Sequence, residues 1–148
     1  MKFKKQLFTV VCIAVAVMLA GCVGGNTNIE PQKLADKIVE KFELQGLTVV
    51  DDAEAQNTYG LVIDVPGEGV EQYEIRVGEE IDDARLLAVV KAKNEEGAEQ
   101  AEDQLRMAAA QAAHEDDVVV VRRNGMYVFA AAGRQADSMA EEFDRLTK

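Results

Sequence analysis

The chain has 148 residues and carries 27 Asp and Glu against 16 Lys and Arg, which gives a formal net charge of -11 at pH 7. A chain of this acidity repels nucleic acid and anionic lipid head groups, so the composition excludes a nucleic-acid partner. Its length suits one folded domain.

The first 21 residues have the composition of an export signal. Three lysines within the first five residues precede an apolar run at residues 7–20. As a helix this run would span about 21 Å, less than the roughly 30 Å hydrocarbon core of a bilayer, so it indicates a signal peptide and not a permanent span. An uncleaved membrane anchor is the alternative interpretation.

A cysteine ends this signal. The stretch LAGC, residues 19–22, resembles the lipobox of bacterial lipoproteins, in which diacylglycerol alkylates the cysteine thiol and the signal is cut just before it. The resemblance implies that residues 1–21 are a lipoprotein signal peptide and that Cys22 is the lipidation site. Two acyl chains attach a protein stably where one chain is marginal. Residues 22–29 then form the lipidated cysteine and a flexible tether, because VGGNTN is rich in glycine and small polar residues.

Removal of the signal changes both the thiol content and the charge. Cys12 leaves with the signal and Cys22 bears the lipid, so the mature domain would have no free thiol. This excludes disulfides, thiolate metal sites and cysteine nucleophiles. The remaining 13 Lys and Arg face 27 Asp and Glu, a net charge of -14.

The first predicted element of the mature chain is an amphipathic helix. It begins at Pro31, carries apolar residues four apart along one face, and ends near Gly46. Residues 53–58 predict a short helical turn, and a loop follows through Pro66 and Gly69.

Two strands and a helix are predicted next. VEQYEIRV, residues 70–77, alternates apolar and polar residues from Tyr73 onward, so one face of this strand meets solvent. RLLAVVKAK, residues 85–93, is nearly continuous in apolar residues and predicts a more central strand. Asn94 offers an N-cap to a helix that runs to about His114 and carries a stripe of small residues.

The clearest local pattern is VVVVRRNGMYVF, residues 118–129. Two β-rich runs flank Asn124 and Gly125, a pair that tolerates positive φ at both central positions of a type I′ turn. The sequence therefore predicts a hairpin with these two residues at its centre. A last amphipathic helix is predicted from Ala136 to Leu146.

The predicted elements follow the order helix, short helix, two strands, helix, two strands, helix. Consecutive strands joined by short links favour antiparallel pairing. We therefore predict an α+β fold: a two-layer sandwich in which a four-stranded, mostly antiparallel sheet has its helices on one face. Residues 30–148 form this single α+β domain.

Three stretches, VEQYEIRV, LLAVVKAKNEEGAEQAEDQL and NGMYVFAAAG, together with the lipobox and the order of elements, resemble an uncharacterised bacterial lipoprotein domain family found mainly in Gram-positive bacteria. The resemblance covers residues 31–146. That family is a domain of unknown function with no known catalytic residues, so the resemblance implies an exported lipoprotein and no particular reaction.

Catalytic patterns are weak in this sequence. His114 is its only histidine and Ser138 its only serine, and Ser138 does not lie in a nucleophile-elbow context. A single histidine at a helix end is more often a solvated residue or a partner of the helix dipole. We therefore expect a protein that is not an enzyme and that needs no cofactor.

Short acidic clusters are the candidate cation ligands. Carboxylates in an extracellular loop would suit Ca²⁺, but the pattern lacks the alternating ligands and glycine of an EF-hand. We expect each cluster to be a solvated turn or strand end unless two of them converge in space. The clusters are Glu79, Glu80, Asp82 and Asp83; Asp51 and Asp52; and Asp116 and Asp117.

Two functions remain open. We favour a non-enzymatic, lipid-anchored interaction domain at the extracytoplasmic face of the cell membrane, which meets another envelope protein or peptide through a sheet face or edge. The alternative is a solute- or cation-binding lipoprotein that uses the acidic loops. Tyr59, next to Gly60, is the aromatic residue placed to contact a partner, although packing is the more usual role.

Overall fold

The computed structural model describes residues 28–78 and 80–148. The signal peptide, Cys22 and nearly all of the tether lie outside these residues, as does Glu79. None of the helices within residues 28–78 and 80–148 has the length and apolar composition that a membrane span requires.

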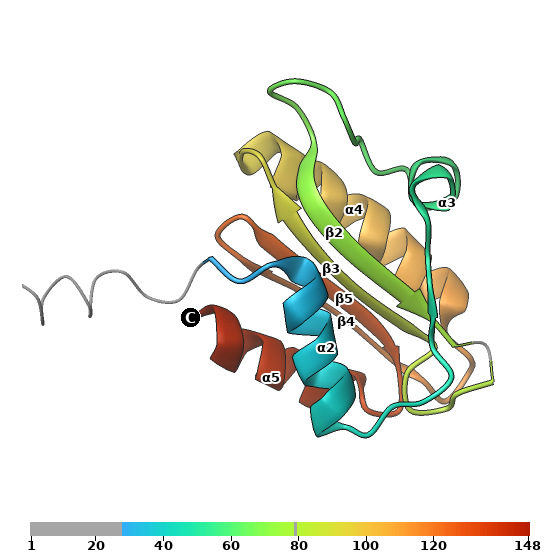
Figure 1. Ribbon diagram of the computed structural model, residues 1–148. Helices are drawn as coiled ribbons and strands as arrows, with labels where there is room; N and C mark the ends of the chain where they lie inside the picture. Colours follow the sequence, from blue (N-terminus) through green and yellow to red (C-terminus); the bar gives the residue numbers. More distant parts are fainter. Residues whose placement is uncertain (1–27, 79) are drawn as a thin grey trace, which may run out of the picture.

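The described residues form five strands and four helices. The sheet has the order β1-β2-β3-β5-β4, and each pair of neighbours is antiparallel (Figure 1). The predicted α+β class with an antiparallel sheet is therefore confirmed. In chain order the elements are α2 (Pro31–Lys41), β1 (Thr48–Val49), α3 (Asp52–Asn57), β2 (Val70–Val77), β3 (Leu86–Ala92), α4 (Glu95–Ala112), β4 (Val118–Asn124), β5 (Tyr127–Gly133) and α5 (Ala136–Thr147).

The prediction of four strands is wrong by one. The additional strand, β1, has two residues and pairs with the end of β2, Thr48 opposite Val77 and Val49 opposite Arg76. Two residues are too few to show the alternation by which a strand is recognised in a sequence. Its partner β2 has the predicted bounds, 70–77.

The prediction that the helices cover one face of the sheet is also wrong. Helix α4 packs on one face, and α2 and α5 pack on the other, so the domain has three layers (Figure 1). Strand β3 shows the reason, because Leu86, Ala88 and Val90 pack with α4 while Leu87 and Val89 pack with α2 and α5. A strand with a nearly continuous apolar run is buried on both faces, and burial on both faces requires helices on both.

The two cores differ in the size of their side chains. Alanines of α4 bring that helix close to the sheet. On the opposite face, Phe143 of α5 stacks on Phe129 of β5 with ring centroids 5.0 Å apart. Helix α2 begins at Pro31 as predicted, but ends at Lys41, before Gly46.

The predicted hairpin is confirmed, but its centre is displaced by one residue. Asn124 pairs with Tyr127, so Gly125 and Met126 are the two turn residues. Gly125 has φ +61 whereas Met126 does not have a positive φ, which fits a type II′ turn and excludes type I′. Asn124 stays in the strand because its Nδ2 donates hydrogen bonds to Asp144 and Thr147 of α5, both at 2.8 Å.

Candidate functional site

The candidate site is the edge of β2 that β1 leaves uncovered. The backbone N–H of Val50, just after β1, still donates to the carbonyl of Ile75 at 2.9 Å. The chain then turns away, because the Asp51 side chain accepts a hydrogen bond from the N–H of Glu54 and caps α3. No described strand pairs with residues 71–74 of β2 on this side.

The hydrogen-bonding groups at this edge can be assigned from the alternation of the strand. The N–H of Gly78 donates to the carbonyl of Arg85, toward β3, while the carbonyl of Ile75 accepts from Val50 on the other side. Successive residues of a strand direct their backbone groups to opposite sides. The N–H and the C=O of Tyr73 therefore point away from β3 and toward the open edge.

A hollow of about 390 Å³ lies along the open edge. A smaller one, about 150 Å³, lies where residues 72–74 meet the beginning of α2. Val50 follows β1 directly and lines the larger hollow, so that hollow lies where a continuation of β1 would pair with β2. The residues around the larger hollow are Val50, Asp52, Ile63, Asp64, Glu71, Gln72, Tyr73 and Glu74.

The electrostatic character of this hollow is acidic. Glu71 Oε2 lies 3.7 Å from Lys91 Nζ, and Glu74 Oε1 accepts a hydrogen bond from Arg76 Nε at 2.8 Å. Asp64 is exposed and has no ion pair among residues 28–78 and 80–148. Its φ of +61 is one of the few left-handed conformations of a non-glycine residue in the described chain, and aspartate is one of the residues that tolerate it.

A hydrogen bond joins the two sides of the hollow. The Tyr73 hydroxyl donates to the Asp52 carboxylate at the beginning of α3. Burial raises the pKa of Tyr73, and the hydrogen bond to Asp52 raises it further. The phenol therefore stays neutral at physiological pH, and α3 is held beside the edge of β2.

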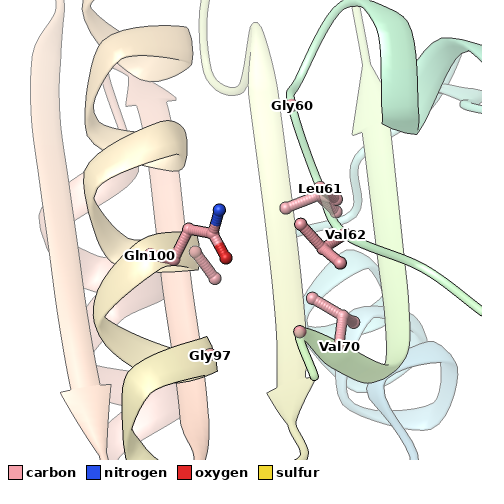
Figure 2. Close-up of a pocket in the computed structure, with 8 residues that line it drawn as sticks. Gly60, Leu61, Val62, Val70, Gly97 and Gln100 are labelled. Carbon is pink, nitrogen blue, oxygen red and sulfur yellow. The ribbon is translucent and has the colours of Figure 1, made fainter. Parts of the chain in front are cut away.

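The loop that carries Ile63 and Asp64 is held from behind by α4. Figure 2 shows Gly60, Leu61, Val62 and Val70 facing Gly97 and Gln100 of α4. This contact is closed, with no space for a water molecule, and a Cβ at Gly97 would lie 2.4 Å from the Gly69 carbonyl oxygen. It is a packing contact and not a binding site.

Polar contacts complete this support at the far end of the loop. Lys93 Nζ donates to the carbonyl of Val65 at 2.7 Å, and Asn94 Nδ2 donates to the carbonyl of Gly67 at 2.9 Å. The wall of the hollow is therefore fixed to the end of β3 and the beginning of α4.

Two of the acidic clusters do converge, but they converge on an arginine. Arg85 Nε donates to Asp117 at 2.6 Å and Arg85 Nη2 donates to Asp82 at 2.8 Å. Burial alone would raise the pKa of Asp117, but hydrogen bonds from the backbone N–H of His114 and from Arg85 lower it. In the described part of the chain, no group of three or more His, Cys, Asp or Glu is placed to hold a metal ion.

The other predicted residues have structural positions. Asp51 caps α3, and Tyr59 is 9% exposed and packs in the core beneath α4, so its role is packing and not partner contact. His114 is exposed after the end of α4, whereas Ser138 is exposed on α5, the helix that packs on the other face. The structure does not bring this histidine and serine to one side of the sheet.

Sequence reasoning predicted an interaction through a sheet face or edge but did not identify the edge of β2. The available signal was Asp51, a good N-cap directly after an apolar pair, which ends β1 early. Comparison with known proteins adds no relative: no protein family, no curated protein and no solved structure matches the chain.

Proposed function

We propose that this protein is a non-enzymatic, lipid-anchored interaction domain of the bacterial cell envelope. In this proposal Cys22 holds it at the extracytoplasmic face of the membrane, and it binds an envelope protein or peptide at the open edge of β2. The LAGC stretch supports the location. The unpaired edge at residues 71–74, with the hollow of about 390 Å³ beside it, supports the interaction.

An open sheet edge is a binding template because its free N–H and C=O groups can pair with another chain. Proteins usually protect such edges with charge, and β2 carries the exposed Glu71 here, with Asp64 beside it. These carboxylates disfavour pairing with a second acidic copy of the chain.

The alternative, a solute-binding lipoprotein, has one observation in its favour. A hollow of about 550 Å³ lies at the other end of the sheet, where Glu54, Glu80 and His114 offer polar side chains. Arg85 also lines it, but its guanidinium binds Asp82 and Asp117. We place the interaction at β2 because its free backbone groups match a polypeptide partner.

The anchor is tested by changing Cys22→Ser. We expect loss of the lipid and of processing, measured as the intact mass of the protein in the membrane fraction. An acylated, processed protein from this variant would contradict the anchoring at Cys22.

The interaction is tested by photo-crosslinking in intact cells. A photo-reactive amino acid replaces Gln72 at the open edge, and in a matched control it replaces Glu99 on the outer side of α4. We expect a cross-linked adduct of discrete mass from position 72 that is absent from position 99. Equal labelling at both positions, or none at either, would contradict an interaction at this edge.

A further inference from the structure

We infer that the occupant of the β2 edge is a basic, extended peptide segment that adds to the sheet as a strand continuing β1. This inference rests on the proposed function, since it names the chemistry of the partner at that same edge. It follows from the direction of the open backbone groups, the place of the hollow and the charge around it.

The direction and register follow from β1. Val49 opposes Arg76, and Val50 still bonds to Ile75, so a strand that continued in this direction would next oppose Glu74, Tyr73 and Gln72. The chain itself cannot supply these residues because it has turned into α3. An incoming segment antiparallel to β2 would exchange two hydrogen bonds with the N–H and C=O of Tyr73.

The side chain opposite Tyr73 would enter the larger hollow. Tyr73 and Ile75 pack on the α4 face of the sheet, and side chains directly opposite one another in a pair of strands share a face. A lysine at that position would lay its aliphatic stem against Ile63 and direct its ammonium group to Asp64 or Asp52. Asp64 has no other ion-pair partner within the described residues.

Charge also decides between the two edges of the sheet. The outer strand at the other edge is β4, which carries Arg122 and Arg123. Arg122 Nε lies 3.8 Å from Asp144 Oδ2, and Arg123 Nη1 lies 3.7 Å from Glu102 Oε2. The carboxylates beside β4 therefore already have arginine partners, whereas Asp64 beside β2 has no ion-pair partner within the described residues and can receive the ammonium group of a basic segment. The net charge of -14 without the signal steers a basic segment toward the domain in general.

The test uses the full chain in neutral detergent micelles and three capped pentapeptides. The first is Lys-Val-Lys-Val-Lys, the second has Glu in place of each Lys, and the third is the lysine peptide with alternate backbone amides N-methylated. Affinity is measured by titration calorimetry, and amide hydrogen exchange is measured residue by residue by NMR. We expect the lysine peptide to bind at least tenfold more tightly than either control and to slow exchange of the Tyr73 amide at least tenfold.

Two isosteric variants distinguish the effect of a carboxylate at the hollow from the effect of the net charge. Asp64→Asn removes the carboxylate at the hollow, and Asp103→Asn removes one on the outer side of α4, so that both change the net charge by one. We expect Asp64→Asn to weaken binding of the lysine peptide at least threefold while Asp103→Asn changes it less than 1.5-fold. Equal weakening by both variants, or equal binding of the N-methylated peptide, would overturn the inference.

The position of the protected amides distinguishes a failure of the basic-peptide inference from a failure of the proposed function. Protection of Val119 and Val121 on β4, with Tyr73 unchanged, would overturn the β2 assignment but leave an interaction domain. No protection at either edge, together with no adduct from position 72 in cells, would overturn the proposed function as well.

Discussion

The ion-pair cluster at Glu142 connects α2 to α5 and predicts a specific dependence of stability on pH. Glu142 is 4% exposed and accepts hydrogen bonds from Arg145, including one from Nε at 2.9 Å, and from Lys41 of α2. The bonds from Arg145, and secondarily that from Lys41, lower the pKa of Glu142 from its usual 4.5 to about 2. The ionised carboxylate therefore stabilises the fold above pH 4.5, and this contribution is lost as the pH falls toward 2.

The size of the contribution follows from the shift. The fall of the Glu142 pKa from 4.5 to about 2 corresponds to an upper limit of about 3 kcal/mol. Lys41 and Arg145 are 52% and 66% exposed, so solvent screening reduces the contribution to roughly 1–2 kcal/mol. We expect Glu142→Gln to lower the free energy of unfolding by this amount at pH 7.

The assay is urea unfolding of the wild type, of Glu142→Gln, and of the neighbouring exposed Glu141→Gln as a matched control. The difference between wild type and Glu142→Gln should fall by half or more between pH 7 and pH 2, and Glu141→Gln should stay within about 0.5 kcal/mol of wild type. A Glu142→Gln deficit that is constant over this pH range, or equal to that of Glu141→Gln, would refute the reasoning.

Three other changes test the fold and the acidic clusters. Gly125→Val should lower stability by about 1–2 kcal/mol in thermal unfolding, because the φ of +61 strains a β-branched residue although its Cβ would meet open space; an unchanged Tm would contradict the turn assignment. Gly97→Ala should also destabilise, by roughly 1–3 kcal/mol, because the clash with the Gly69 carbonyl outweighs the gain of about 1 kcal/mol in helix propensity; a higher Tm would show that the loop yields. Millimolar CaCl₂ should raise the Tm no more than NaCl of matched ionic strength, because Arg85 already binds the converging carboxylates, and a Ca²⁺-specific rise would favour the cation-binding alternative.

Most elements of this fold are visible in the sequence because their signals are local. Pro31 begins α2, Asn94 caps α4 by accepting from the N–H of Gly97 at 2.8 Å, and the alternation of residues 70–77 marks β2. These features depend on near neighbours in the chain, which is why the sequence alone predicts them.

The arrangement of layers was also within reach of the sequence. The run LLAVVKA of β3 is apolar on both faces and indicates burial on both, although the element order by itself favours a two-layer fold. The observed centre of the hairpin turn differs from the predicted one for another reason. Asn124 makes hydrogen bonds to α5, and contacts between such distant residues are not read from a dipeptide pattern.

The candidate site is the least predictable part because it is made by segments that meet only in the folded chain. The hollow exists because Asp51 ends β1, because Asp64 returns beside β2, and because Gly97 lets the loop pack close to α4. Each residue has an ordinary local role, and only their juxtaposition creates the open edge.

The most direct measurement of the central claim is the set of nuclear Overhauser contacts between the bound lysine peptide and β2. We expect Hα–Hα contacts to Gln72 and Glu74 from the two peptide residues that flank the one opposite Tyr73, in an antiparallel register that continues β1 beyond Val50. Contacts to β4 alone, or to the hollow beside Tyr59 and His114, would contradict the account.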